Sequence, residues 1–431
     1  MTEPEPRITQ GYARYVLGVL FSVSALSFID RNVLSILIEP IKQEFGVSDT
    51  AMGLLAGPAF VLFYTLCGIP IARWSDRGVR RSIIALGVAL WSLMTALSGL
   101  AQSFWQLAAI RVGVGVGEAA GGPPAHSLVS DYFPPHQRGR ALSILALGIQ
   151  AGIAFGVFAG AWLQEFFGWR WAFVAVGLPG LAVAALVRFS VRELPRGYSD
   201  AQARESEQEH STADAFRYLG SLPSFRGILI AQSFIGVAGY GIAVWAPTFL
   251  VRVHGMGYGE VGTWIGFSTL LGATIGTYGG GALGDRLGAV DARRYLYVAA
   301  AAPILGAPLG LFFAASSQQT AALLCYAPFI LAVALHSGPT FAMLQALAPP
   351  GMRAMSTAIM MFVANLIGMG AGPLVVGALN DLLAPHYGQD AIRFTLMFVV
   401  SLNVFAGLFF WLAARTLRED LQRTARYTQT A

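Results

Sequence analysis

Four charged residues interrupt apolar stretches of this chain and are its first candidates for chemistry. Asp30 and Arg31 lie in one such stretch, and Arg111 and Glu118 lie in another. If these stretches cross a membrane, an ionised side chain near the bilayer centre costs at least about 2.5–3.5 kcal/mol, so such residues usually pair or face a water-filled cavity. The four residues therefore mark a candidate site for binding a charged ligand or moving a proton.

Their spacing indicates how they can meet. Arg111 and Glu118 are seven positions apart, which places them on one face of a helix and about 10 Å apart along its axis. Asp30 and Arg31 are adjacent, so on a helix they point about 100° apart and cannot share one simple partner. The pattern predicts a network between the two helices, with zero formal charge when all four residues are ionised.

The chemistry of each side chain suggests its role. Arg31 has a planar, permanently charged guanidinium that suits a phosphate or carboxylate headgroup, and Arg111 is a second candidate. Asp30 and Glu118 can exchange a proton as their surroundings alternate between dry and wet. We therefore predict substrate binding and proton coupling at these four residues, and a purely structural ion network is the alternative.

The elements that carry these residues follow from composition. The chain has 431 residues, of which 55% are hydrophobic and 12% charged, with a mean hydropathy of +0.59. A soluble globular protein is about one quarter charged, so that class is excluded. Cys67 and Cys325 are the only cysteines, which excludes a disulfide scaffold. The fold class is an all-α membrane protein with several spanning helices.

Twelve apolar segments are long enough to cross a bilayer as helices. They are 13–38, 50–72, 82–101, 104–129, 140–163, 169–190, 225–250, 258–283, 294–315, 319–347, 354–379 and 392–414. An even number of spans places both termini on the same side of the membrane.

The distribution of basic residues indicates which side that is. Most arginines flank the connections on the side of the termini, whereas Lys42, Arg170, Arg252 and Arg393 lie on the other side. By the positive-inside rule, we predict an inner (plasma) membrane protein with both termini in the cytoplasm. The arginines do not cluster as nucleic-acid binding requires, so no nucleic-acid partner is expected.

The polar stretch between the sixth and seventh segments divides the chain. We predict a six-helix bundle over 1–190, a cytoplasmic linker over 191–223, a second six-helix bundle over 224–414 and a cytoplasmic tail over 415–431. The linker is predicted to hold a short amphipathic helix that Ser211 or Thr212 caps.

The two bundles share motifs at a nearly constant offset. The Asp-Arg pair at 76–77 recurs 209 positions later at 285–286, and the Pro-Pro-x-x-Arg motif at 134–138 recurs 215 positions later at 349–353. Two motifs at almost the same offset indicate an internal duplication, which is common in transporters. A solvated charged loop is the alternative interpretation of the Asp-Arg motifs.

These motifs, with the glycines at 113, 115 and 117 that follow Arg111, resemble the major facilitator superfamily over essentially the whole chain. The resemblance implies a fold of two pseudo-symmetric six-helix bundles. It also implies that Asp76 latches the bundles on the cytoplasmic side when the transporter faces outward, although Ala72 and Gly78-Val79 depart from the usual motif. The residues expected to act in gating are Asp76, Arg77, Arg80, Asp131, Arg138, Asp285 and Arg286.

Two stretches resemble a narrower branch. The sequences at 28–31 (FIDR) and 113–119 (GVGVGEA), the latter continuing to 131–134 (DYFP), are similar to the Spinster family. That resemblance implies transport of sphingosine-1-phosphate or lysophospholipids. A neighbouring branch of organic-anion symporters shares the Asp-Arg and Gly-Glu pairs.

The second bundle carries no charge in its spans comparable with Asp30 or Glu118, which suits an amphiphile with its headgroup on the first bundle and its tail along the second. We therefore predict a monomeric secondary active transporter that moves a lipid-like substrate by proton-coupled alternating access. Its expected partners are this substrate, protons and the surrounding membrane lipids. A proton-coupled symporter of small organic anions and a non-transporting receptor are the alternatives. We expect no cofactor and no metal, and the absence of nucleotide-binding and catalytic motifs argues against an enzyme.

Glycines recur every four residues in the fifth span, at 148, 152, 156 and 160. This spacing places them on one face, where another helix can approach closely. Plain helix packing and sliding during transport are both open interpretations.

Overall fold

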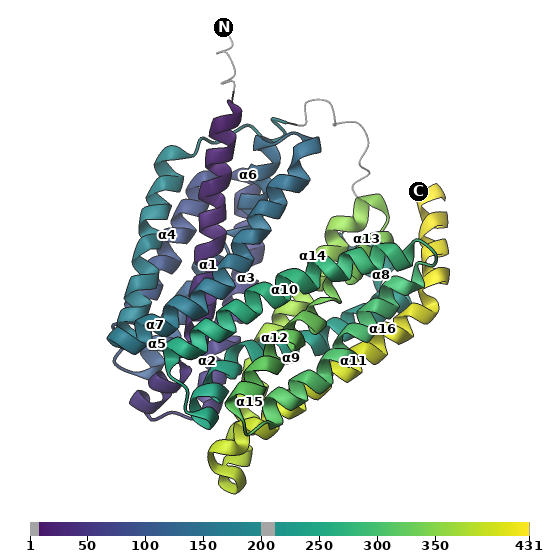
Figure 1. The fold of residues 1–431 in the computed structure, drawn as a ribbon. Coiled ribbons are helices and arrows are strands. Elements are labelled where there is room, and N and C mark those ends of the chain that lie inside the picture. The colour runs from purple at the N-terminus through teal and green to yellow at the C-terminus, as the bar shows by residue number, and fades with distance from the viewer. Residues whose placement is uncertain (1–7, 200–211, 431) are drawn as a thin grey trace. The chain divides into compact units, whose positions relative to one another are not determined.

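The computed structural model describes residues 8–199 and 212–430, which are helical apart from short connections and contain no strand (Figure 1). The first part of the chain forms α1 (Gln10–Phe45), α2 (Asp49–Ala56), α3 (Pro58–Arg77), α4 (Arg80–Ser98), α5 (Phe104–Glu118), α6 (Gly122–Tyr132) and α7 (Pro135–Ser190). The later part forms α8 (Thr212–Ser221), α9 (Pro223–His254), α10 (Tyr258–Gly288), α11 (Arg293–Ala315), α12 (Gln319–Ala334), α13 (Ser337–Ala346), η1 (Pro350–Met352), α14 (Arg353–Val363), η2 (Ala364–Met369), α15 (Gly370–Tyr387), η3 (Gly388–Asp390) and α16 (Ala391–Thr430).

These helices supply the twelve predicted spans. Eight helical stretches among the described residues are long and apolar enough to cross a membrane. Two of the eight, Pro135–Ser190 and Pro350–Gln429, each contain two spans. The chain turns within α7 at Gly168, whose φ of 81° suits glycine, and it turns between α15 and α16 at η3. The helices α5 with α6, and α10, provide the remaining two spans.

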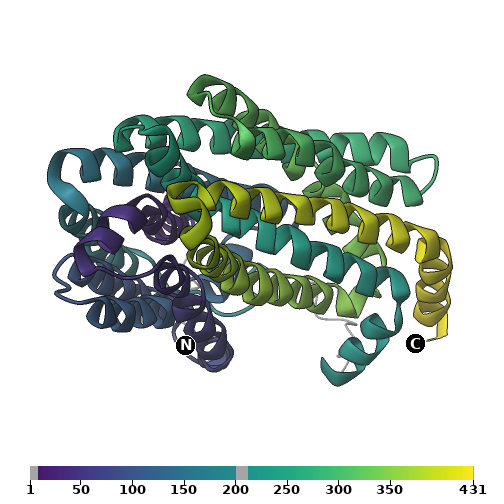
Figure 2. The same ribbon diagram turned by 90° about the horizontal axis from the view of Figure 1, so that it is seen from below.

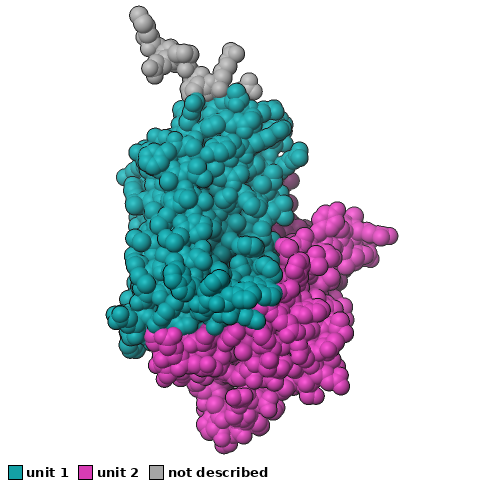
Figure 3. All heavy atoms as spheres, turned by 60° about the vertical axis from the view of Figure 1, so that its left-hand side comes forward, with its two compact units in different colours: residues 1–37, 62–206 teal, residues 38–61, 207–431 magenta. Residues whose placement is uncertain are grey.

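The chain divides into two compact units, which Figure 3 colours separately. The first contains residues 1–37 and 62–206, and the second contains 38–61 and 207–431. These units differ from the two bundles predicted along the sequence, because the end of α1, all of α2 and the start of α3 pack with the second unit. The candidate site residues of α1 lie in the first unit.

The glycine ridge of α7, formed by Gly148, Gly152, Gly156 and Gly160, packs directly against α1. A Cβ at Gly156 would lie 2.7 Å from the carbonyl oxygen of Ile29, and one at Gly148 would lie 2.9 Å from that of Phe21. A Cβ at Gly152 would meet the carbonyl oxygen of Ala25, and one at Gly160 would lie 2.7 Å from a side-chain methyl group of Val33. The ridge therefore forms a close contact between α7 and α1. This contact sets which face of α1 points toward α7 next to residues 30 and 31.

The fourth and tenth spans are each broken near the same repeat position. In the fourth span, α5 ends at Glu118 and α6 begins at Gly122. In the tenth, α12 ends at Ala334 and α13 begins at Ser337, which are 216 and 215 positions later. The apolar segments 104–129 and 319–347 predict one continuous helix for each span. The break in the fourth span places Glu118 at the end of a helix.

The predicted linker helix and tail pack together in the second unit. The helix α8 is present at Thr212–Ser221, whereas Ser211, one of its predicted caps, lies outside the described residues. Residues 415–430, predicted as a tail, continue α16 as a helix, which runs beside α9 and α11 (Figure 2). Ala215 and Leu219 of α8 share a buried apolar cluster with Phe225 and Leu417.

Candidate substrate and coupling site

The four charged residues form two ion pairs between α1 and α5. The Nε of Arg31 lies 2.5 Å from Oε2 of Glu118, and a guanidinium nitrogen of Arg111 lies 3.0 Å from Oδ1 of Asp30. Asp30, Arg111 and Glu118 are each 2% exposed. Neighbouring residues of α1 thus pair with different residues of α5, as their angular separation requires.

Neutral side chains complete the surroundings of Arg31 and Glu118. The hydroxyl of Ser27 donates a hydrogen bond of 2.8 Å to Oε2 of Glu118, the same oxygen that Arg31 contacts. The guanidinium carbon of Arg31 lies 4.8 Å from the ring centre of Phe28 and 4.7 Å from that of Tyr64. The ring faces attract the cation, so the arginine is held by a carboxylate and two aromatic rings.

Two of these neutral residues, Ser27 and Tyr64, were not predicted from the sequence. Ser27 precedes Arg31 by four positions and therefore shares its face of α1, a signal that helical spacing contains. Tyr64 comes from α3, and nothing local in the sequence links it to Arg31. Its place depends on tertiary packing.

The break in the fourth span acts on the charge of Glu118. Glu118 is the last residue of α5, where the helix dipole presents its negative end and disfavours a carboxylate. Arg31 and Ser27 favour the ionised form. These influences oppose one another at a carboxylate that is almost completely buried.

One carboxylate oxygen of Asp30 and one of Glu118 can still accept a hydrogen bond. Asp30 Oδ2 and Glu118 Oε1 are buried, and neither accepts a hydrogen bond from the described residues. A buried acceptor without a partner is costly, and it can be satisfied by a proton, a water molecule or a ligand donor. The described residues contain no group of three or more His, Cys, Asp or Glu side chains placed to hold a metal ion.

The two bundles differ in how many charged side chains they bury. Among its described residues from 223 to 414, no Asp, Glu, Lys or Arg is fully buried. In the described part of the first bundle, six charged residues are fully buried: Asp30, Asp49, Arg80, Arg111, Glu118 and Asp131.

Two of the predicted gating residues, Arg80 and Asp131, meet in a buried cluster of the first unit. Arg80, which is fully buried, pairs with Asp131 of α6 and, at 2.7 Å, with Glu193 beyond α7. Asp131 also accepts a hydrogen bond of 2.9 Å from the backbone of Gly197. The cluster ties the start of α4 to α6 and to the segment that follows α7.

The other predicted gating residues make fewer contacts. Asp76 and Arg77 are exposed, Arg286 is exposed, and Asp285 accepts a hydrogen bond of 2.9 Å from the Tyr295 hydroxyl. Arg138 donates from Nε to the carbonyl oxygens of residues 130 and 133 and so closes the turn between α6 and α7. The latch that the resemblance implies for Asp76 stays a prediction.

An ionic cluster within the second unit was not predicted from the sequence. Asp291, between α10 and α11, pairs with Arg293 at 3.0 Å and with Arg418 of α16 at 2.9 Å. Hydrogen bonds from Arg293 lower the pKa of Asp291 to about 2. The Asp291–Arg418 pair is formed across 127 positions, so it leaves no local signal in the sequence.

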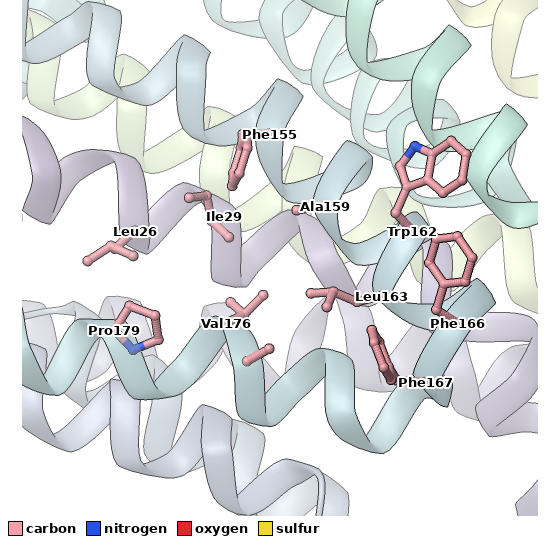
Figure 4. A pocket seen from close by; sticks show the side chains of 11 residues that line it. Leu26, Ile29, Phe155, Ala159, Trp162, Leu163, Phe166, Phe167, Val176 and Pro179 are labelled. Carbon is pink, nitrogen blue, oxygen red and sulfur yellow. The ribbon is translucent and has the colours of Figure 1, made fainter.

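An apolar pocket of about 440 Å³ lies on a different face of α1, against two stretches of α7 (Figure 4). Leu26 and Ile29 of α1 and Leu163, Val176 and Pro179 of α7 line it. A helix turns about 100° per residue, so Ile29 points about 200° away from Arg31. The pocket is therefore distinct from the ionic site.

Comparison with known families and proteins gives a consistent result. Residues 20–373 match the family description "Major Facilitator Superfamily". The chain is 33% identical to an MFS-type efflux pump of Mycolicibacterium smegmatis, over 95% of this chain and 94% of that protein. It is 28% identical to human protein spinster homolog 1, over 98% of this chain and 84% of the relative.

Solved structures agree with these similarities. A bacterial homologue of the human lysosomal transporter Spinster, in an inward-facing and unoccupied conformation, is similar with a TM-score of 0.89 and 30% identity, covering 96% of this chain and 99% of that one. A D-xylose-proton symporter is similar with a TM-score of 0.74 and 18% identity, covering 93% and 97% of the two chains. The second similarity concerns the fold alone.

Proposed function

This chain belongs to the Spinster branch of the Major Facilitator Superfamily, a transporter family, and from that premise we propose that it moves an amphiphilic lipid-like substrate by proton-coupled alternating access. The substrate would be of the sphingosine-phosphate or lysophospholipid type. The observation that carries the proposal is the buried Arg31–Glu118 pair at the break of the fourth span.

The pair can link a proton to an anionic headgroup. Arg31 cannot give full contact to a phosphate while it pairs with Glu118, so the headgroup and the carboxylate compete for one guanidinium. A proton on Glu118 removes the competing charge and frees Arg31. Because the two binding events favour each other, substrate binding promotes protonation and protonation promotes substrate binding to the same degree.

The Asp30–Arg111 pair would support this exchange. It places a second arginine and a second carboxylate next to the first pair, and Asp30 keeps one oxygen without a hydrogen-bond partner among the described residues. In the proposal, Arg111 adds attraction for the headgroup, and Asp30 offers an alternative proton acceptor.

The apolar character of the second bundle supports a substrate with a hydrocarbon tail, since no acidic or basic side chain is fully buried among its described spans. Export is the direction we favour, because a relative covered over almost its whole length is described as an efflux pump. We place the protein in the inner membrane with both termini in the cytoplasm, on the distribution of its arginines.

The test is uptake of a labelled lysophospholipid into proteoliposomes, with and without a pH gradient. We expect the gradient to accelerate the wild type, Arg31→Ala to lower the rate by about tenfold or more, and Glu118→Gln to lose the acceleration. Arg217→Ala, which changes an arginine whose side chain is 82% exposed, is the control and should transport normally.

Four outcomes would change the proposal. Equal wild-type rates with and without the gradient would remove proton coupling. Normal transport by the double variant Arg31→Ala with Glu118→Gln would remove the site. Binding of sugar acids or short carboxylates in preference to lysolipids would favour the organic-anion symporter, and binding without transport would favour a receptor.

A further inference from the structure

A further ionic network joins four helices within the second unit, at the end of that unit away from the C-terminus. It consists of Glu39 and Lys42 near the end of α1, Asp49 at the start of α2, Arg252 near the end of α9 and Asp381 on α15. All five lie in the second compact unit. In sequence, however, α1 and α2 belong to the first repeat, whereas α9 and α15 belong to the second.

Arg252 of the second repeat forms ion pairs with two acidic residues of the first repeat. Its guanidinium contacts Glu39 at 2.7 Å and both carboxylate oxygens of Asp49, at 2.7 and 3.0 Å. The fork of the arginine is therefore fully engaged with two acidic residues of the first repeat. Its side chain is only 10% exposed.

Asp49 is the centre of the network. Besides Arg252, it accepts from Lys42 at 2.5 Å and from the amide of Asn380 at 3.0 Å, and it is 2% exposed. A carboxylate removed from water in this way depends on its partners, because leaving it unpaired and buried is strongly unfavourable. Two of these partners, Arg252 and Asn380, come from the second repeat.

Asp381 also links the two repeats, but here the acidic side chain comes from the second repeat and the donors come from the first. Its carboxylate accepts hydrogen bonds from the backbone nitrogens of Asp49 and Thr50, at 3.0 and 2.7 Å, at the N-terminus of α2. An acidic side chain from α15 thus satisfies the free backbone donors of a helix from the first repeat. Neither Asp381 nor Asp49 belongs to a motif that predicts a role from the sequence.

The backbones beneath the network are in close contact. A Cβ at Gly53 of α2 would lie 2.5 Å from the carbonyl oxygen of Pro373, and one at Gly57 would lie 2.7 Å from that of Gly370. At these two glycines, the backbones next to each other leave no room for even a β-carbon. The ionic network covers the end of that contact.

We propose that this network, centred on Asp49 and Arg252, is the ion lock of the outward gate, holding α1 and α2 of the first repeat to α9 and α15 of the second. The proposal rests on alternating access, which requires this end to open. Opening separates Arg252 from both acidic partners and frees the N-terminus of α2 from Asp381. The lock therefore sets how often the gate opens when no substrate is bound.

The experiment measures the distance between spin labels on the two sides of the lock, in ligand-free protein in nanodiscs. Cys67 and Cys325 are replaced by serine, and labels are attached at Glu44→Cys and His386→Cys, which are exposed positions near the ends of α1 and α15. We expect one short distance in this background. Arg252→Ala should raise the ratio of long to short distances by about tenfold or more.

A matched control is available at the same end of the molecule. Arg393 pairs with Asp390 at 3.2 Å and donates to the carbonyl oxygens of Ala314 and Ser316, all within the second repeat. Arg393→Ala therefore removes a comparable arginine without cutting a link between repeats. It should leave the label distances unchanged.

A gentler variant keeps the test decisive if Arg252→Ala does not fold. Asp49→Asn preserves the shape and one acceptor while removing the charge, so it should shift the distances in the same direction by a smaller amount. Unchanged distances in the folded lock variants, or an equal change in Arg393→Ala, would overturn the lock.

The readout is independent of the substrate and of proton coupling. Label distances that respond as expected, together with a failure to transport lysolipids, would leave the lock standing and remove the proposed substrate. Transport that behaves as proposed, with label distances that ignore Arg252 and Asp49, would remove the lock alone.

Discussion

At the residue scale, the candidate site depends on the geometry of one arginine. The guanidinium of Arg31 is held by Glu118 through Nε and lies close to the rings of Phe28 and Tyr64. A lysine has a single compact charge, so it could not offer a planar face to two rings and a fork to a headgroup together. The residue type was therefore informative in the sequence, although the aromatic neighbours were not.

Asp291 provides a residue-scale test of where pH acts. Its pKa is lowered to about 2 by Arg293, so the stability this carboxylate contributes is complete above its usual value of 3.8 and is lost only as the pH falls through about 2. It stays ionised across the physiological range. Asp291→Asn should therefore leave the pH dependence of transport between about pH 5 and pH 8 unchanged.

The measurement is the transport rate as a function of pH for Asp291→Asn beside Glu118→Gln. Both variants replace a carboxylate by an amide, but only Glu118 lies in the buried pairs. A pH profile that moves with Asp291→Asn would place a proton-sensitive step at the junction with Arg418.

At the element scale, the helices were largely predictable, whereas their interruptions were not. Long apolar runs predicted the spans because a spanning helix must satisfy its backbone internally. The break after Glu118 was missed, although Gly122 followed by two prolines is a typical helix start. Apolar periodicity continues across a break, so it does not reveal where hydrogen bonding stops.

Some ion pairs could also be predicted from the sequence, and others could not. The adjacency of Asp30 and Arg31 predicted that they take different partners, and the structure places them in two pairs with α5. The network of Asp49 and Arg252 joins residues 203 positions apart, and no local pattern announces it. Such contacts are set by how helices pack, which the sequence of one helix does not contain.

The glycine ridge gives an element-scale prediction. At Gly156 a side chain would meet the Ile29 backbone, with a Cβ 2.7 Å from its carbonyl oxygen. Gly156→Leu should therefore push α1 away from α7 and destabilise the protein by about 1–3 kcal/mol or more, which a lowered thermal unfolding midpoint in detergent would report. Because Ile29 precedes Asp30 and Arg31, substrate binding should weaken as well.

Gly139 is the control on the same helix. Nothing lies within 4 Å of a Cβ at this position, so Gly139→Leu should have little effect on the midpoint. If both variants lower the midpoint equally, the effect belongs to loss of glycine in α7, and the ridge is not a close contact.

At the scale of the whole molecule, the duplication does not make the halves equivalent. The first bundle carries the Asp30–Arg111 and Arg31–Glu118 pairs, whereas the second receives the linker helix and the end of the chain. Tyr218 of α8 donates a hydrogen bond of 3.0 Å to Thr424, and its ring centre lies 4.4 Å from that of Tyr427. The continuation of α16 thus ties the linker to the second bundle.

Asp420 makes this tie testable. It is 2% exposed, and one carboxylate oxygen accepts from both the backbone nitrogen and the hydroxyl of Ser224, at 2.8 and 2.6 Å, at the start of α9. Asp420→Ala leaves two buried donors of α9 without this acceptor, which should cost about 1–3 kcal/mol and lower the thermal unfolding midpoint. The neighbouring Glu419→Ala, at an exposed position, should not. Because Asp420 lies far along the chain from the ion pairs, transport per folded molecule should persist in Asp420→Ala, and its loss at an unchanged midpoint would show that the end of α16 acts in the transport cycle.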